Sequence, residues 1–69
     1  MMKISARNVI DGAVKEVKKG ATTAHVLIDV SGATLTAAIT NESVDELGLK
    51  PGVKVKAVIK SSDVMIAVG

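Results

Sequence analysis

The chain has 69 residues, a formal net charge of +2 at pH 7 and 48% hydrophobic residues, yet it contains no Phe, Tyr, Trp or Cys. This length fits one domain, which at this size buries only about 60% of the surface that its unfolded chain exposes. The missing Cys excludes disulfides and thiolate metal sites. We therefore expect an oligomer, in which a partner chain covers apolar surface that a monomer would leave bare.

The charge balance excludes further classes of protein. A net charge of +2 suits a small anion but is too low for a nucleic-acid footprint. No apolar stretch is long enough to span a bilayer, and polar residues follow Met1-Met2-Lys3-Ile4 too soon for a signal peptide. We expect a cytoplasmic protein without membrane contacts.

The first half of the chain alternates between apolar and polar residues. From Val9 to Lys18, the odd-numbered side chains are predicted to share one face of a strand and the even-numbered ones the other. A Lys19-Gly20 turn then leads to a second strand at 24–30. Ser31-Gly32 is a hairpin signal, and a third strand follows at 34–40.

The period changes after the third strand. Thr40 or Asn41 can cap a short helix that runs through Leu47. Gly48 stands where a glycine in the left-handed conformation commonly ends a helix.

Two more strands are predicted after the helix. The Lys50-Pro51-Gly52 turn leads to a fourth strand at 53–60, and the run 64–68 predicts a fifth that is apolar on both faces. This last strand must be covered by the barrel or by a neighbouring subunit. Five strands with one short helix between the third and the fourth predict an all-β, five-stranded OB-like Greek-key barrel, with the helix closing one end. No linker or repeat divides residues 1–69, so we expect a single domain.

Two polar clusters of small residues border the predicted strands: Ser5-Ala6-Arg7-Asn8 and Lys60-Ser61-Ser62-Asp63-Val64. Each brings one cation together with hydroxyl and backbone N–H groups, which is the chemistry of an oxyanion site. A tetrahedral dianion without a proton needs donors and moderate positive charge, and a nearby carboxylate would repel it. The candidate donors are Ser5, Arg7, Thr40, Lys60 and Ser61, and the small Ala6 lets the backbone approach the anion closely.

Each of these residues also has an ordinary structural interpretation. Arg7 and Lys60 are equally suited to a solvated surface, and the serines to turns. Thr40 serves as well for a helix N-cap as for a ligand contact. His25 is a lone histidine on a strand, to which we assign no role.

Three motifs occur in order along the chain: Ser5-Ala6-Arg7-Asn8, the phrase from Ile39 to Leu49, and the phrase from Ala57 to Met65. Together they resemble the molbindin or Mop domain over residues 3–68. The resemblance implies an intracellular protein that binds molybdate, and tungstate similarly, for the storage or homeostasis of molybdenum, and that assembles as a homohexamer, a trimer of dimers.

The resemblance also implies the residues of the site. Ser5, Arg7 and Lys60, with the main chain at Ala6 and Ser61, would come from one subunit, and Thr40 from its dimer partner. No side chain would coordinate a metal directly, and no cofactor is implied besides the oxyanion. Phosphate carries a proton near neutral pH and needs a hydrogen-bond acceptor, so a site made of donors alone should disfavour it. The choice of molybdate over sulfate rests on the resemblance.

Other functions remain as alternatives. A nucleic-acid-binding OB barrel commonly stacks bases on aromatic side chains, and this chain has none. A catalytic function is disfavoured because there is no Cys nucleophile, no Ser-His-Asp spacing and no glycine-rich phosphate loop. A general oligomeric interaction module is the remaining alternative.

Overall fold

The fold is known from a computed structural model that describes residues 3–69. Its helices and strands, in chain order, are β1 (Asn8–Lys19), β2 (Thr23–Val30), β3 (Ala33–Thr40), α1 (Asn41–Leu47), β4 (Lys54–Ile59) and the 3-10 turn η1 (Ser61–Asp63). The first four predicted strands and the helix between the third and the fourth are therefore confirmed.

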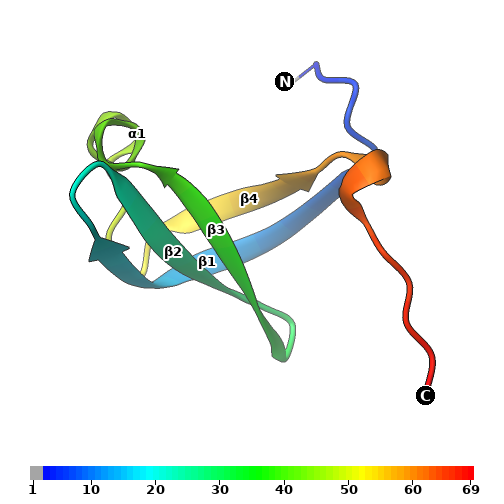
Figure 1. The fold of residues 1–69 in the computed structure, drawn as a ribbon. Coiled ribbons are helices and arrows are strands. Elements are labelled where there is room, and N and C mark those ends of the chain that lie inside the picture. Colours follow the sequence, from blue (N-terminus) through cyan, green and yellow to red (C-terminus); the bar gives the residue numbers. More distant parts are fainter. Residues whose placement is uncertain (1–2) are drawn as a thin grey trace.

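The strands form one antiparallel sheet in the order β3-β2-β1-β4 (Figure 1). The long strand β1 serves two neighbours: its first half, from Asn8 to Ala13, pairs with β4, and its second half, from Ala13 to Lys19, pairs with β2. Within the described residues β3 and β4 do not pair with each other, so the sheet curls without closing into a barrel.

A β-bulge lies in the middle of β1. Val14 pairs with Ile28 and Glu16 pairs with Leu27, which leaves Lys15 as an extra residue without a partner across the ladder. The bulge turns both Val14 and Val17 towards the core, although a regular strand would place them on opposite faces. The predicted alternation is therefore wrong beyond Lys15.

The strand β1 also passes unusually close to β2 at Gly12. A Cβ atom at this position would lie 2.6 Å from the Asp29 carbonyl oxygen and 2.7 Å from Cγ1 of Val30. Real Cβ atoms essentially never come this near, so the approach of the two strands requires glycine here.

The core is formed mainly by one face of β2. Its buried side chains are Val14, Ala24, Val26, Ile28, Val30 and Val44. Val44 is the one buried residue of α1 and attaches the helix to the end of the sheet. The helix ends at Gly48, whose φ of 63° is left-handed, as predicted. Mostly β structure with one short helix agrees with the OB-like fold class.

The predicted fifth strand does not form. Residues 64–68, here called the C-terminal run, have no regular structure and extend away from the sheet (Figure 1). Met65, Ile66 and Val68 are 92%, 85% and 98% exposed. A continuous apolar run is not sufficient for a strand, because the backbone also needs an adjacent strand edge to pair with.

Candidate functional site

The two polar clusters meet at one end of the sheet. Asn8 and Ile59 are the last register pair of the β1–β4 ladder. Residues 5–7 lead directly into Asn8, and residues 60–61 follow directly after Ile59. We call these two stretches the donor segments. The structure thus places five of the six predicted site residues in segments from opposite ends of the chain that adjoin one register pair.

One side-chain hydrogen bond links the strands at this point. The Nδ2 atom of Asn8 donates to the carbonyl oxygen of Ile59 over 3.2 Å, and the bond is partly buried. Sequence reasoning noticed Asn8 as part of a polar cluster but gave it no role. Only the register of β1 against β4 reveals that its side chain joins the two strand ends from which the donor segments extend.

The donor segments present their polar groups to solvent. Ser5, Arg7, Lys60 and Ser61 are exposed and Ala6 is half-buried. Among residues 3–69, no side-chain hydrogen bond or ion pair involves these four polar residues. The first N–H groups of a 3-10 turn have no acceptor within the turn, which leaves those at the start of η1 for other partners.

Positive charge without a carboxylate partner is not special to this end of the sheet. Lys18, Lys19 and Lys56 form ion pairs with nearby carboxylates, but other exposed lysines in the described chain do not. The distinguishing feature is that Arg7 and Lys60 flank the same register pair, next to serine hydroxyls and turn amides. The arrangement can accept the oxygens of a small anion.

Thr40 lies at the other end of the sheet. It pairs with Thr23, next to the end of β1 at Lys19, whereas Arg7 precedes the start of β1. The 12 residues of β1 separate the two ends, a path of roughly 35 Å if the strand were straight. Figure 1 shows α1 and η1 on opposite sides of the molecule. A single chain therefore does not bring Thr40 to the donor segments.

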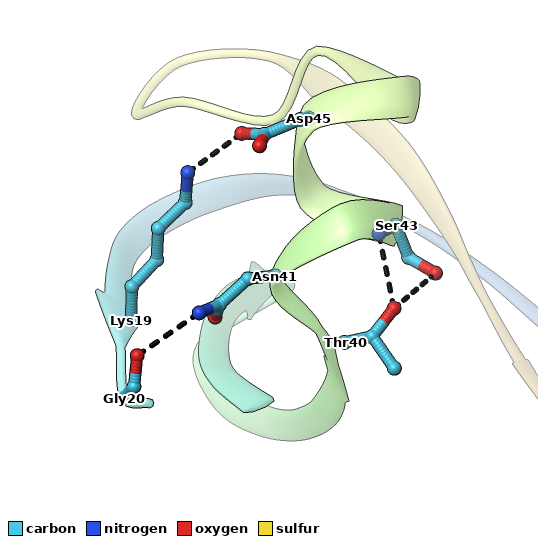
Figure 2. Close-up of polar contacts among 6 residues, drawn as sticks. All are labelled: Lys19, Gly20, Thr40, Asn41, Ser43 and Asp45. Carbon is cyan, nitrogen blue, oxygen red and sulfur yellow. Dashed lines mark hydrogen bonds and ion pairs between the residues drawn. The ribbon is translucent and has the colours of Figure 1, made fainter. Parts of the chain in front are cut away.

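The structural interpretation of Thr40 is confirmed. Its Oγ1 accepts the N–H of Ser43 over 3.0 Å, as a helix N-cap does, and donates to Oγ of Ser43 over 2.8 Å (Figure 2). The hydroxyl is exposed in spite of both contacts.

The start of α1 is fastened to the β1–β2 turn. Asn41 donates from Nδ2 to the carbonyl oxygen of Gly20 over 2.9 Å and from its backbone N–H to that of Thr22 over 2.8 Å. Nζ of Lys19 lies 2.6 Å from Oδ1 of Asp45 (Figure 2). These contacts, which sequence reasoning missed because the partners are distant along the chain, fix the position of Thr40 at the edge of the molecule.

An apolar groove lies between the open edges of the sheet. It has a volume of about 370 Å³, and its lining includes Val26, Leu35, Ile39, Leu49, Val55 and Ala57. Within residues 3–69 there is no group of three or more His, Cys, Asp or Glu side chains that could hold a metal ion. No helix in this part of the chain is long and apolar enough to cross a membrane.

The chain is similar to known proteins over nearly its whole length. The TOBE domain matches residues 4–66. Molybdenum-pterin-binding protein 1 of Clostridium pasteurianum is 50% identical over 66 residues, which cover 94% of this chain and 97% of that protein.

Two solved structures have the same fold. A molybdate-binding protein from Sporomusa ovata has a TM-score of 0.93 and 43% identity, over 97% of this chain and 100% of that one. The cytoplasmic molybdate-binding protein ModG, with molybdate bound, has a TM-score of 0.88 and 45% identity, over 93% of this chain and 46% of that one. The chain therefore belongs to the TOBE domain family and, within it, to the Mop-type molybdenum-binding proteins that its three motifs resemble.

Proposed function

We propose that this protein binds molybdate reversibly in the cytoplasm and serves the storage or homeostasis of molybdenum, with tungstate bound in the same way. The observation that carries the proposal is the meeting of the donor segments at one end of the sheet, with two cations and two serine hydroxyls that have no protein partner among residues 3–69. The names of the relatives support molybdate as the anion.

The proposed site is shared between two chains. Ser5, Ala6, Arg7, Lys60 and Ser61 of one protomer form the larger part, and Thr40 of the partner completes it. Two observations support this division: Thr40 lies at the far end of its own sheet, and the donor segments are open to solvent in a single chain. A dianion held by exposed donors competes with water, so closure by a second chain would strengthen every contact.

The apolar surface supports an oligomer. In the C-terminal run Met65, Ile66 and Val68 are at least 85% exposed, and the groove between β3 and β4 offers apolar surface and two unpaired strand edges. In the proposed assembly, a homohexamer built as a trimer of dimers, a neighbouring subunit covers the run. Residues 1–69 act in it as one Mop domain.

The same site argues for binding without chemistry. The six proposed residues include no Cys, His or carboxylate that could activate a serine hydroxyl for nucleophilic attack. The relatives compared above are named as binding proteins, which supports a protein that is not an enzyme. The proposal includes no nucleic acid and no membrane as partner.

Titration calorimetry of the anion-stripped protein tests the function. Molybdate is expected to bind with micromolar or tighter affinity to an oligomer seen by native mass spectrometry, while sulfate gives no heat at the same concentrations. Binding of neither anion by a folded oligomer would overturn the proposal and leave a protein-interaction module as the better explanation.

The shared site is tested by complementation between two variants. Arg7→Ala and Thr40→Val oligomers are each expected to bind molybdate more weakly, Arg7→Ala by about tenfold to a hundredfold, because hydrogen bonds to charged groups are the stronger class. In a mixed dimer, a shared site puts both defects into one site and leaves the other site intact.

Refolding the two variants together should therefore restore wild-type affinity at half of the sites in mixed dimers. If each chain instead formed its own site, every site would carry one defect and mixing would restore nothing. The separately refolded variants, combined at the same total concentration, are the control.

A further inference from the structure

We propose that Asn8 is a positioning residue for the oxyanion: its side chain holds the two donor segments at a fixed separation, and so sets both the affinity for molybdate and the discrimination against sulfate. The inference rests on the proposed function and adds a residue that makes no contact with the anion itself.

The position of Asn8 carries the argument. It forms the last pair of the β1–β4 ladder with Ile59, and Nδ2 of Asn8 donates to the Ile59 carbonyl oxygen over 3.2 Å. The next residue outward on one strand is Arg7, and the next on the other is Lys60. The hydrogen bond therefore joins the two backbones at the point where the donor segments diverge.

Packing does little to hold this end of the sheet. Val9, Ile10 and Val58 are 43%, 38% and 37% exposed, while the fully buried core lies farther along β1 and in β2. The ends of a ladder fray where few apolar contacts support them. Among residues 3–69, the Asn8 amide makes the one side-chain hydrogen bond between the strands at this end, and its half-buried position shields the bond from water.

Fixed separation matters for selectivity. Molybdate and sulfate are both tetrahedral dianions, so donors on two segments can distinguish them only by size. If the distance between the donor segments varied, the site could no longer select an anion by its size. Its total positive charge would be unchanged, so it would still attract both dianions. Loss of the Asn8 bond should therefore reduce the ratio of molybdate to sulfate affinity, which a loss of overall stability alone would not do.

The test compares Asn8→Leu with Asn8→Gln. Leu keeps a similar size but has no donor, and Gln keeps an amide donor on a longer arm. Asn8→Leu is expected to bind molybdate about tenfold more weakly, the equivalent of one net hydrogen bond, with a smaller change for sulfate. Asn8→Gln is expected to recover part of both the affinity and the selectivity.

A matched control comes from the same pair of strands. Asp11 pairs with Lys56 across the β1–β4 ladder, and Nζ of Lys56 lies 2.6 Å from Oδ1 of Asp11. The hydrogen bond and the positive charge of Lys56 lower the pKa of Asp11, so the link is ionic at neutral pH. Asp11→Ala removes this link three residues away from Asn8 and is expected to leave molybdate affinity within about twofold of wild type.

Sulfate and molybdate titrations of wild type and variants are run side by side, with native mass spectrometry on each sample. Wild-type affinity and selectivity in Asn8→Leu would overturn the role of Asn8 while leaving the proposed function intact. Failure of the wild type itself to bind molybdate would overturn the function, and with it this inference. If Asn8→Leu does not assemble, Asn8→Ser, whose hydroxyl is too short to span the strands, takes its place with the same expected loss.

Discussion

At the scale of single residues, Gly12 shows how closely β1 and β2 are packed. A Cβ atom there would meet a backbone oxygen at 2.6 Å and two side-chain methyl groups at 2.7 and 2.8 Å. The methyl groups can move a little, but the carbonyl of Asp29 belongs to the sheet and cannot shift without disturbing the ladder. Any side chain at this position would force a neighbouring group to move.

Gly12→Ala is therefore expected to destabilise the protein by about 2 to 3 kcal/mol, the upper part of the range for overpacking a core. Denaturant unfolding at one fixed protein concentration measures the change, since the stability of an oligomer depends on concentration. Gly48→Ala is the comparison: its left-handed backbone costs about 1 kcal/mol, but its Cβ would meet nothing within 4 Å. Equal stability of Gly12→Ala and wild type would show that β1 and β2 can move apart at this point without cost.

At the scale of elements, local sequence patterns predicted the features that depend only on residues close together in the chain. Alternation located four strands, and the capping chemistry of Thr40 and Gly48 located both ends of α1. The same patterns missed the bulge at Lys15, because a bulge depends on which residues of β1 must reach the core formed with β2. They also predicted a fifth strand at 64–68, which needs a strand edge that this chain alone does not supply.

The candidate site also combines features that the sequence predicted with features that only the structure shows. The two donor segments were visible in the sequence, because cations, serines and small residues lie beside strand ends. That they meet follows from pairing of Asn8 with Ile59, 51 residues later, which no local pattern encodes. The distance of Thr40 from the donor segments, and the role of Asn8 between them, likewise required the register of the whole sheet.

The bulge leads to a prediction about β1. Deleting Lys15 would join Val14 directly to Glu16. Their present partners, Ile28 and Leu27 respectively, are already consecutive on β2. A regular ladder would result, and both Val14 and Val17 would still face the core. The deletion variant is therefore expected to fold with the same sheet, which circular dichroism and native mass spectrometry can establish.

Deletion of Leu27 from β2 is the control, because it shifts the register against β1 and β3 together and should abolish folding. If the Lys15 deletion also fails to fold, the bulge is required for its bend, since one strand must serve both β2 and β4.

At the scale of the whole molecule, a single chain leaves many large hydrophobic side chains exposed to water. Nine large hydrophobic residues of the described chain are more than a third exposed, and four of them, Val64, Met65, Ile66 and Val68, lie in the C-terminal run. The run follows directly after the donor segment at residues 60–61 and η1. Assembly and anion binding are thus adjacent in the chain, so a partner that covers the run also approaches the site.

Ile66→Asp tests the role of the run. A carboxylate in the middle of an apolar contact would have to be desolvated without a partner, so the variant is expected to form species smaller than the wild-type oligomer and to bind molybdate weakly. Size-exclusion chromatography with light scattering measures the mass. Ser31→Asp, on the exposed turn between β2 and β3, introduces the same charge away from both the run and Thr40 and should retain the wild-type mass.

The core of each subunit predicts how the dissociated variant behaves. Among residues 3–69, every buried hydrophobic residue lies in the sheet or α1, and none lies in the C-terminal run. Ile66→Asp chains should therefore keep the fold of β1 to β4 at low stability, because a chain of this size buries little surface alone. A wild-type mass for Ile66→Asp would mean that the run stays in solvent within the oligomer, and that the subunits meet through another surface.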